Sequence, residues 1–413
     1  MIKSFSCFSI LMLIYFQHSQ AQISGCTDPL AANYNSSAIN NDGSCVYDPA
    51  SVAPITSLLL DDSLAETSGL IKWDGYIWAH NDNTDTNIYS LDTATGVIIQ
   101  SYPLSNVVNN DWEEISQDSN FVYLGDFGNN VNGNRTDLHI LRIEKNSLLN
   151  NTPDIDTIWF SYSDQTDFTP TGSNNTDFDC EAFIVSDDSI YLFTKQWVSN
   201  ATGVYALPKT PGSYTADLKT IFDVNGLITG ATYLESKKSI ALCGYSNLLS
   251  PFIYLLYDFS GSDFFSGNKR KISVSLGFHQ VEGITTENGL TYWISNEHFV
   301  QPPFVDNPQK LHVLDLESFL GDYFNSLIND VLDIESEYEF EVYPNPANQW
   351  AVVSYQSIEE ESIVLKVFDL LGEEIYSCSF TANCILPTAD WTSGFYILQA
   401  GKNYRQLLGV IKR

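Results

Sequence analysis

Carboxylates recur at one position of a repeated sequence pattern, so metal binding is the first chemistry to consider. Three copies of the pattern begin with Glu113, Glu181 and Glu282. Further carboxylates stand two positions before the start of a copy, on the same side of an extended strand. They are Glu66, Asp111 and Asp179. Oxygen ligands suit a hard cation, and Ca²⁺ tolerates a wide, flexible site better than Mg²⁺ does.

The same pattern predicts where these side chains meet. In a ring of such repeats, the first strand of each copy would line a central channel, and its start would lie beside the end of the second strand. The second strands end near Asp82, Asp126 and Glu297. We therefore expect a calcium site at one end of the channel. The predicted ligands are Glu66, Asp111, Glu113, Asp126, Asp179, Glu181 and Glu282.

Carboxylates gathered around one channel need a counter-charge. Two charges about 5 Å apart repel by roughly 3 kcal/mol at an effective dielectric constant near 20. Lys195 is the only basic residue at the repeat positions, so a bound cation or protonation would have to supply the rest. The alternative is structural, with glutamates that begin strands and cap backbone amides between neighbouring sheets.

Three histidines fall near the same end of the channel and could act as acid or base. They are His80, His279 and His298. His139 and His312 instead occupy a column that is tyrosine in the other copies, which indicates a packing role. The sequence contains no nucleophile elbow, zinc-helix motif or phosphate loop.

Five copies of one pattern between residues 66 and 300 must position these side chains. In four of them an aromatic residue follows the second position at the same spacing. These pairs are Gly69 and Trp78, Glu114 and Tyr123, Ala182 and Tyr191, and Gly283 and Tyr292. Each copy reads as at least three short strands and most as four, and such repeats form a β-propeller. We expect an all-β chain with a five-bladed β-propeller over residues 51–332, and a diverged sixth blade stays open.

The last copy has no fourth strand of its own. An unassigned apolar segment, Ile55 to Leu60, lies before the first copy. We expect this segment to complete the last blade and to close the ring, because open sheet edges invite aggregation.

The charge of the chain excludes several classes of partner. Its 413 residues carry 19 Lys and Arg against 51 Asp and Glu, for a formal net charge of −32. Such a field repels phosphate backbones and anionic lipid. We therefore expect no nucleic acid and no membrane surface as partner, whereas divalent cations are attracted.

Residues 1–21 are predicted to be a secretory signal peptide. Lys3 precedes an apolar run from Phe5 to Phe16, and Ser19-Gln20-Ala21 provides a small-residue cleavage site. The run is too short to span a bilayer, so we expect no transmembrane segment in the mature chain. A second interpretation stays open, since Ile23-Ser24-Gly25-Cys26 resembles the lipobox of bacterial lipoproteins.

The chain has 7 cysteines, and removal of the signal peptide would take away Cys7 and leave an even number. Cys26 and Cys45 enclose a stretch rich in Asp and Asn that resembles the short Cys-bounded repeats of Bacteroidetes surface proteins. With few apolar residues, residues 22–50 are expected to form a loop closed by a disulfide. Local pairing is expected for Cys378 and Cys384. Two further cysteines either pair or stay as buried thiols, namely Cys180 and Cys243.

Four motifs at the starts of the copies carry a family resemblance. They are Glu66-Thr67-Ser68-Gly69-Leu70, Asp111-Trp112-Glu113-Glu114-Ile115, Asp179-Cys180-Glu181-Ala182 and Glu282-Gly283-Ile284. They resemble the motifs of secreted propellers related to phytase-like and esterase-like proteins. The resemblance implies calcium in the channel and hydrolysis of an ester or phosphoester. The sequence lacks the basic cluster that would hold a polyanionic phosphate, which argues against phytase activity itself.

An acidic stretch, residues 333–339, predicts a solvated linker before the C-terminal part. Three motifs then follow in order within residues 340–413. They are Val342-Tyr343-Pro344-Asn345-Pro346-Ala347, Leu365-Lys366-Val367-Phe368-Asp369-Leu370-Leu371-Gly372 and Ser393-Gly394-Phe395-Tyr396. The segment resembles the C-terminal sorting domain of the type IX secretion system, and its alternating strands predict a small β-sandwich. The resemblance implies recognition by the type IX secretion machinery and passage through the outer membrane.

The sequence therefore predicts a protein of the extracellular space or the outer-membrane surface, reached through the periplasm. Its propeller is expected to act as an extracellular binding module around a calcium-binding channel, for a ligand that the sequence does not identify. The alternative is a calcium-dependent hydrolase of esters or phosphoesters. An enzyme would need Glu113, Glu181 or Glu282 for turnover but not for folding.

Overall fold

The computed structural model describes residues 23–332, 339–356, 363–369, 372–381, 383–400 and 406–412. The chain divides into two compact units, Met1–Ser326 and Leu327–Arg413, and each is described by itself. The predicted signal peptide lies outside the described residues. So does the predicted acidic linker, apart from Glu339.

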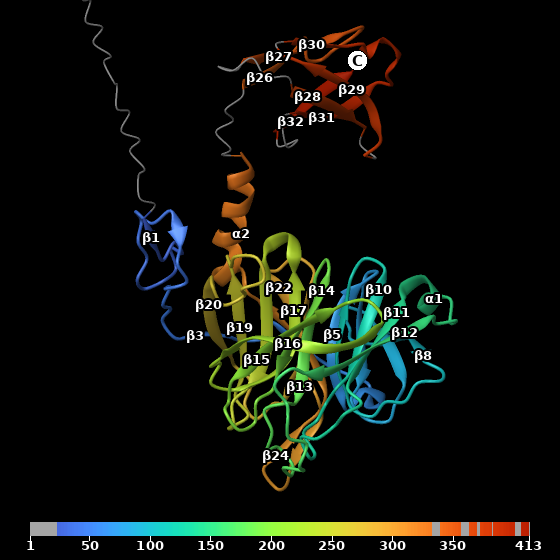
Figure 1. The fold of residues 1–413 in the computed structure, drawn as a ribbon, viewed down its shortest axis with the longest axis vertical. Helices are drawn as coiled ribbons and strands as arrows, with labels where there is room; N and C mark the ends of the chain where they lie inside the picture. The colour runs from blue at the N-terminus through green and yellow to red at the C-terminus, as the bar shows by residue number, and fades with distance from the viewer. Residues whose placement is uncertain are drawn as a thin grey trace, which may run out of the picture. The chain divides into compact units, whose positions relative to one another are not determined.

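Figure 1 shows the fold of the chain. Within its described residues, the first unit contains five groups of four antiparallel strands. The first two groups are β5 (Thr67–Trp73), β6 (Tyr76–Asn81), β7 (Asn87–Leu91) and β8 (Ile98–Pro103), then β9 (Trp112–Gln117), β10 (Phe121–Asp126), β11 (His139–Glu144) and β12 (Ile155–Tyr162). The next two are β13 (Cys180–Val185), β14 (Ser189–Thr194), β15 (Thr202–Pro208) and β16 (Gly212–Phe222), then β17 (Leu227–Leu234), β18 (Ser239–Tyr245), β19 (Pro251–Tyr257) and β20 (Asn268–Val274). The last is β21 (Val281–Thr286), β22 (Thr291–Asn296), β25 (Lys310–Asp315) and β4 (Thr56–Leu59).

Smaller elements occupy the connections of the first unit. Helix α1 (Lys145–Leu149) follows β11, and the hairpin of β23 (Phe299–Gln301) and β24 (Val305–Asn307) precedes β25. Strands β12 and β16 also pair in parallel, which joins the second group to the third. Helix α2 (Glu317–Leu332) follows the last group.

The first strands of the five described groups form a closed ring. β5 contacts β9, β9 contacts β13, β13 contacts β17, β17 contacts β21, and β21 returns to β5. Four-stranded units around such a ring give a propeller-like body, as the repeat predicts. Each inner strand begins at the repeated motif, so equivalent positions in the sequence occupy equivalent positions around the ring.

The N-terminal strand closes the last group. β4 pairs antiparallel with β25, with Ser57 opposite His312. The prediction that the segment from Ile55 to Leu60 completes the last sheet is confirmed. The closure joins residues from the two ends of the repeat region, so the ring holds together only when both ends are folded.

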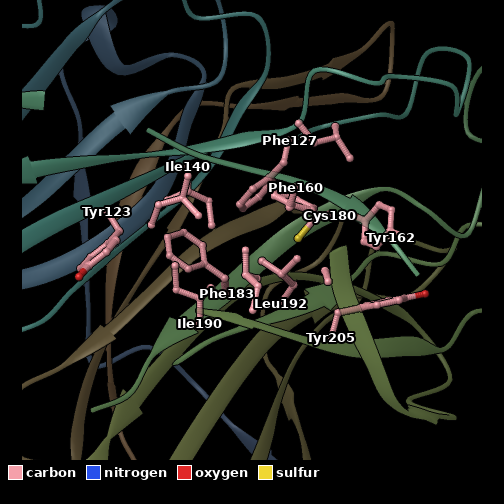
Figure 2. Packing of buried hydrophobic residues seen from close by; sticks show 14 of the residues in the cluster. Tyr123, Phe127, Ile140, Phe160, Tyr162, Cys180, Phe183, Ile190, Leu192 and Tyr205 are labelled. Atoms are coloured by element: carbon pink, nitrogen blue, oxygen red, sulfur yellow. The ribbon is translucent and has the colours of Figure 1, made fainter. Parts of the chain in front are cut away.

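Apolar side chains fill the space between neighbouring groups. Figure 2 shows the cluster between the second and third groups, where Tyr123 and Phe127 pack against Phe183. Phe127 and Phe183 meet edge to face, with ring centroids 5.6 Å apart. Cys180 lies in this cluster and Cys243 is also buried, and both are free thiols. The structure therefore resolves the open alternative in favour of unpaired cysteines.

The Cys-bounded segment packs on the fourth group. Its predicted Cys26–Cys45 disulfide is present, and β1 (Ser24–Gly25) pairs with β2 (Asn40–Asn41) inside it. Asp28 accepts hydrogen bonds from the hydroxyls of Tyr47 at 2.7 Å and Tyr257 at 2.5 Å. β3 (Ala50–Val52) then pairs in parallel with β20. A buried carboxylate and a sheet extension thus fix this segment.

Replacing Tyr257 with phenylalanine should lower the free energy of unfolding by about 1.5 to 3 kcal/mol, because a hydrogen bond to a charged acceptor is lost. Asp28 is buried, so bulk water does not replace the bond. Chemical denaturation of the full chain measures the effect, with Tyr34→Phe as control because Tyr34 is 45% exposed. Equal stability of Tyr257→Phe and the wild type would show that this contact does not stabilise the segment.

The second unit contains two sheets in its described residues. One is β26 (Glu339–Tyr343), β27 (Ala351–Gln356) and β30 (Asn383–Leu386), and the other is β29 (Glu374–Phe380), β28 (Ile363–Phe368), β31 (Gly394–Ala400) and β32 (Gln406–Lys412). Buried side chains from both sheets, among them Val353, Leu365 and Leu398, form one cluster. The predicted Cys378–Cys384 disulfide is present and links β29 to β30.

Candidate metal centre

The inner strands bring carboxylates to one end of the ring. Glu113, Glu181 and Glu282 are the second residues of β9, β13 and β21, and all three are buried. Burial raises the pKa of Glu113 well above its usual value, and the nearby Glu181 and Asp111 raise it further. We call this end the acidic mouth. Its carboxylates are Glu66, Asp82, Asp111, Glu113, Asp179, Glu181, Glu282 and Glu297.

Lys195 supplies a built-in cation to one side of the acidic mouth. Its Nζ lies 3.2 Å from Glu181 Oε1, and it sits over the rings of Trp197 at 4.7 Å and Tyr245 at 5.3 Å. Burial acts to lower the pKa of Lys195, but Glu181 and other negative neighbours raise it well above its usual value. The side near β13 is therefore already neutralised by an ammonium group held between two aromatic rings.

Two further predicted ligands have partners within the protein. Asp126 Oδ1 accepts from Arg135 at 2.6 Å. Asp179 accepts hydrogen bonds from the Asn129 amide at 2.5 Å and from Trp197 Nε1 at 2.7 Å. Arg135 therefore neutralises Asp126, and two hydrogen-bond donors occupy the oxygens of Asp179. Both carboxylates have a structural role that requires no metal.

The opposite side of the mouth holds a carboxylate triad of Glu66, Asp82 and Glu297. One oxygen from each lies within 4.8 Å of the others. Glu66 precedes β5, Asp82 follows β6 and Glu297 follows β22, so the first and last groups meet here when the ring closes. Within the described residues, no Lys, Arg or His forms an ion pair with any of the three.

Burial and mutual repulsion raise the pKa values of two carboxyl groups in this triad. Burial, followed by the charges of Glu297 and Glu66, raises the pKa of Asp82 to about 8. Burial and the adjacent Glu66 raise the pKa of Glu297 to about 7. These carboxyls therefore resist ionisation near neutral pH unless a cation compensates their charge.

The sequence placed Asp82 and Glu297 beside the mouth, but the predicted ligand set did not include them. A signal for them existed, because each follows directly on the last residue of a second strand, Asn81 of β6 and Asn296 of β22. The same position after β10 is taken by Phe127. The sequence does not show that the first and last copies meet when the ring closes, and this contact brings Asp82 and Glu297 together.

Glu114 fills the channel below the mouth and was not predicted to do so. It is fully buried and accepts hydrogen bonds from the amides of Ile115 at 2.9 Å and Ala231 at 2.7 Å. Burial raises its pKa well above the usual value, although these amides and that of Leu70 act in the opposite direction. A Cβ on Gly69 would lie 2.3 Å from Glu114 Oε1, so the neighbouring strand needs a glycine there.

The three histidines predicted near the mouth occupy different settings. His80 is fully buried, and burial lowers its pKa to about 4. His298 Nε2 lies 2.9 Å from Asp306 Oδ1, and the ring of His279 lies 5.8 Å from that of His312. Among the described residues, no hydrogen bond or ion pair joins these imidazoles to the triad, so their role as acid or base stays a prediction.

A hydrogen-bonded chain of Ser57, His312 and Asn296 has the distances of a catalytic triad. Ser57 Oγ lies 2.7 Å from His312 Nδ1, and His312 Nε2 lies 2.8 Å from Asn296 Oδ1. Burial, helped by His279, lowers the pKa of His312 to about 3, so its imidazole is a weak base at neutral pH. The bonds connect β4, β25 and β22, and we interpret them as part of the ring closure.

Comparison with solved structures finds distant similarities. The PQQ-bound form of aldose sugar dehydrogenase from Streptomyces coelicolor shares 11% identity, covers 64% of this chain and 98% of its own, and has a TM-score of 0.38. The WD40 repeats of RRP9 share 9% identity with this chain, and the match covers 65% of this chain and 100% of theirs, with a TM-score of 0.35. PorZ is a surface component of the type IX secretion system of Porphyromonas gingivalis. It shares 12% identity with this chain, and the match covers 84% of this chain and 45% of PorZ, with a TM-score of 0.30. These scores support no functional assignment, and a sequence search of curated proteins gives no match.

The C-terminal part gives a definite result. Residues 341–409 match the family described as secretion system C-terminal sorting domain, in agreement with the motifs. Such a domain implies handling by the type IX secretion system and export to the cell surface or the extracellular space. In the range that the structure describes, no helix is long and apolar enough to cross a membrane. The chain therefore ends in a type IX secretion system sorting domain that follows a propeller-like body.

Proposed function

We propose that this protein is an extracellular binding module, a five-bladed β-propeller with a calcium ion at its acidic mouth. Its C-terminal unit would be a two-sheet sandwich that delivers the propeller through the type IX secretion system. The carboxylate triad of Glu66, Asp82 and Glu297 carries this proposal, because it gathers three carboxyl groups within 4.8 Å of one another and, among the described residues, no Lys, Arg or His forms an ion pair with them. The phytase-like and esterase-like resemblance of the motifs implies calcium in the same channel.

The donor set suits Ca²⁺ in particular. Calcium accepts about 6 to 8 oxygen ligands at variable geometry, and three carboxylates would supply between three and six of them. The remaining positions would be open to water or to an oxygen of an extracellular ligand. Lys195 already neutralises Glu181 and Arg135 already neutralises Asp126, so we place the ion on the side of the triad and leave Asp126 out of the ligand set.

Metal content and thermal unfolding of the full chain test this proposal. Calcium at about 100 times its Kd should raise the free energy of unfolding by about 2.7 kcal/mol relative to chelator. A Glu66→Gln, Asp82→Asn, Glu297→Gln variant should bind no ion and show no stabilisation. The matched control changes three exposed carboxylates outside the mouth, Asp217→Asn, Glu235→Gln and Asp263→Asn, and should respond like the wild type. A wild type without bound calcium, or a triad variant that still binds it, would overturn the site.

A further inference from the structure

The channel has a second opening at the end opposite the acidic mouth. A cavity of about 240 Å³ lies there and is lined by residues from all five inner strands. The lining segments are Leu70–Lys72 of β5, Ile115–Gln117 of β9, Val185 of β13, Ala231–Leu234 of β17 and Thr285–Glu287 at the end of β21. These residues follow the repeated motifs, so the cavity is built by the same strands as the mouth but at their other ends.

Glu114 separates this cavity from the acidic mouth. Its carboxyl group spans the ring from β9 to the Ala231 amide of β17, and it lies against Gly69 of β5. The mouth carboxylates precede Glu114 in the motif, whereas the cavity begins at Ile115. The two ends are therefore chemically distinct compartments, and a ligand can bind in the cavity without contacting the triad.

Lys72 gives the cavity a positive charge that is only loosely held. Its side chain is 9% exposed, and its Nζ lies 3.4 Å from Glu287 Oε2, whose side chain is 70% exposed. An ion pair with a solvated carboxylate contributes little stability. A ligand carboxylate can therefore take the place of Glu287 on Lys72 without a large loss.

The rest of the lining is rich in groups that bind hydroxyls. Within the described residues, the hydroxyls of Ser116, Thr232 and Thr285 have no hydrogen-bond partner in the protein although all three line the cavity. The amide of Gln117 is held in place, since it donates to the Lys72 carbonyl oxygen and accepts from Lys145, both at 2.8 Å. Three hydroxyls without partners in the described part of the chain and one fixed amide therefore surround the ammonium group of Lys72, which makes the cavity a polar pocket.

We propose that this cavity binds a small hydroxylated carboxylate, such as a hydroxy acid or a sugar acid. One ammonium group matches a single negative charge, whereas phosphate sites generally use Arg forks or several cations. The volume corresponds to about eight water molecules at ~30 Å³ each, which limits the ligand to a small molecule. The proposal does not depend on calcium, because Glu114 lies between the cavity and the triad.

Isothermal titration of the full chain with glycerate and with glucuronate tests the proposal, with glycerol and glucose as neutral counterparts. The acids should bind and their neutral counterparts should bind at least about tenfold more weakly, as expected for loss of a charge-assisted hydrogen bond. Lys72→Gln should weaken acid binding by a similar factor. Glu287→Gln should strengthen it about two- to fivefold, because the competing carboxylate is gone. Lys219→Gln, which removes an exposed lysine paired with Asp217, should change nothing.

The outcomes separate this site from the calcium site. Acid binding should be the same in calcium and in chelator, and it should persist in the Glu66→Gln, Asp82→Asn, Glu297→Gln variant. Equal binding of acids and neutral polyols, unchanged binding by Lys72→Gln, or no binding of either acid would overturn the proposal. None of these results bears on whether the triad holds calcium.

Discussion

Without calcium, the free energy of unfolding should fall by about 2 kcal/mol or more, relative to the Glu66→Gln, Asp82→Asn, Glu297→Gln variant, as the pH rises from about 5 to about 8. The pKa of Asp82 is raised to about 8 and that of Glu297 to about 7, whereas both groups titrate near pH 4 in an unfolded chain. The folded state therefore holds more protons across this window. Its extra stability is complete below about pH 4 and is lost as the pH rises through 7 and 8.

Calcium should remove most of this dependence. The ion binds ionised carboxylates and competes with protons, so its affinity rises with pH over the same window. In excess calcium the carboxylates of the triad are ionised in the folded state, as they are in the unfolded chain over this window, so they should contribute little change in stability between about pH 5 and pH 8. Chemical denaturation at constant ionic strength, with calcium or with chelator, measures both slopes. A wild type whose stability in chelator depends on pH in the same way as that of the Glu66→Gln, Asp82→Asn, Glu297→Gln variant would contradict the raised pKa values of the triad.

The neutral variant Glu66→Gln, Asp82→Asn, Glu297→Gln supplies the control for this experiment. It lacks the titrating groups of the triad, so it shows the pH dependence of the rest of the protein, and its stability should exceed that of the wild type at pH 8 in chelator. Two buried histidines act in the opposite direction, because burial lowers the pKa of His80 to about 4 and that of His312 to about 3. Their contribution is present above about pH 6.5 and is lost as the pH falls. The variant keeps both histidines, so subtraction isolates the triad.

The ring was predictable because the spacing of the repeat records strand pairing. The interval from Gly69 to Trp78 spans one hairpin, in which Ile71 lies opposite Trp78. The same interval in other copies therefore located the first two strands of each group. The closing strand β4 was predictable for a related reason, since one copy lacked a strand and one apolar segment had no place. The two disulfides followed from the spacing of the cysteines.

The ligand set was less predictable because charge compensation does not follow the repeat. Lys195 neutralises Glu181 and Arg135 neutralises Asp126, and neither base has a counterpart in the other copies. The triad depends on a contact between the first and last groups, so Asp82 and Glu297 come together only when the ring is closed. The cavity at the other end has no sequence signature, since its hydroxyls are ordinary strand residues.

Replacing Glu114 with alanine should be among the most destabilising single changes in the first unit, with a loss of about 3 to 5 kcal/mol. The change removes the acceptor for the amides of Ile115 and Ala231, and each buried amide without a partner costs about 1 to 3 kcal/mol. It also leaves a cavity in the centre of the ring, which adds to the loss. Chemical denaturation measures the effect, with the exposed Glu235→Ala as control.

A Glu114→Leu variant distinguishes lost hydrogen bonds from lost volume. Leucine restores most of the volume but accepts no hydrogen bond, so it should be nearly as unstable as alanine, whereas glutamine keeps one acceptor oxygen and should fall between them. A leucine variant as stable as the wild type would show that Glu114 acts as filler. The space that the Glu114 side chain occupies also explains the small residues at the second position of other copies. Gly69 leaves room for the Glu114 side chain, and a Cβ on Gly283 would lie 2.5 Å from the Ser68 carbonyl oxygen. The inner strands therefore approach too closely at these positions for a second long side chain beside Glu114.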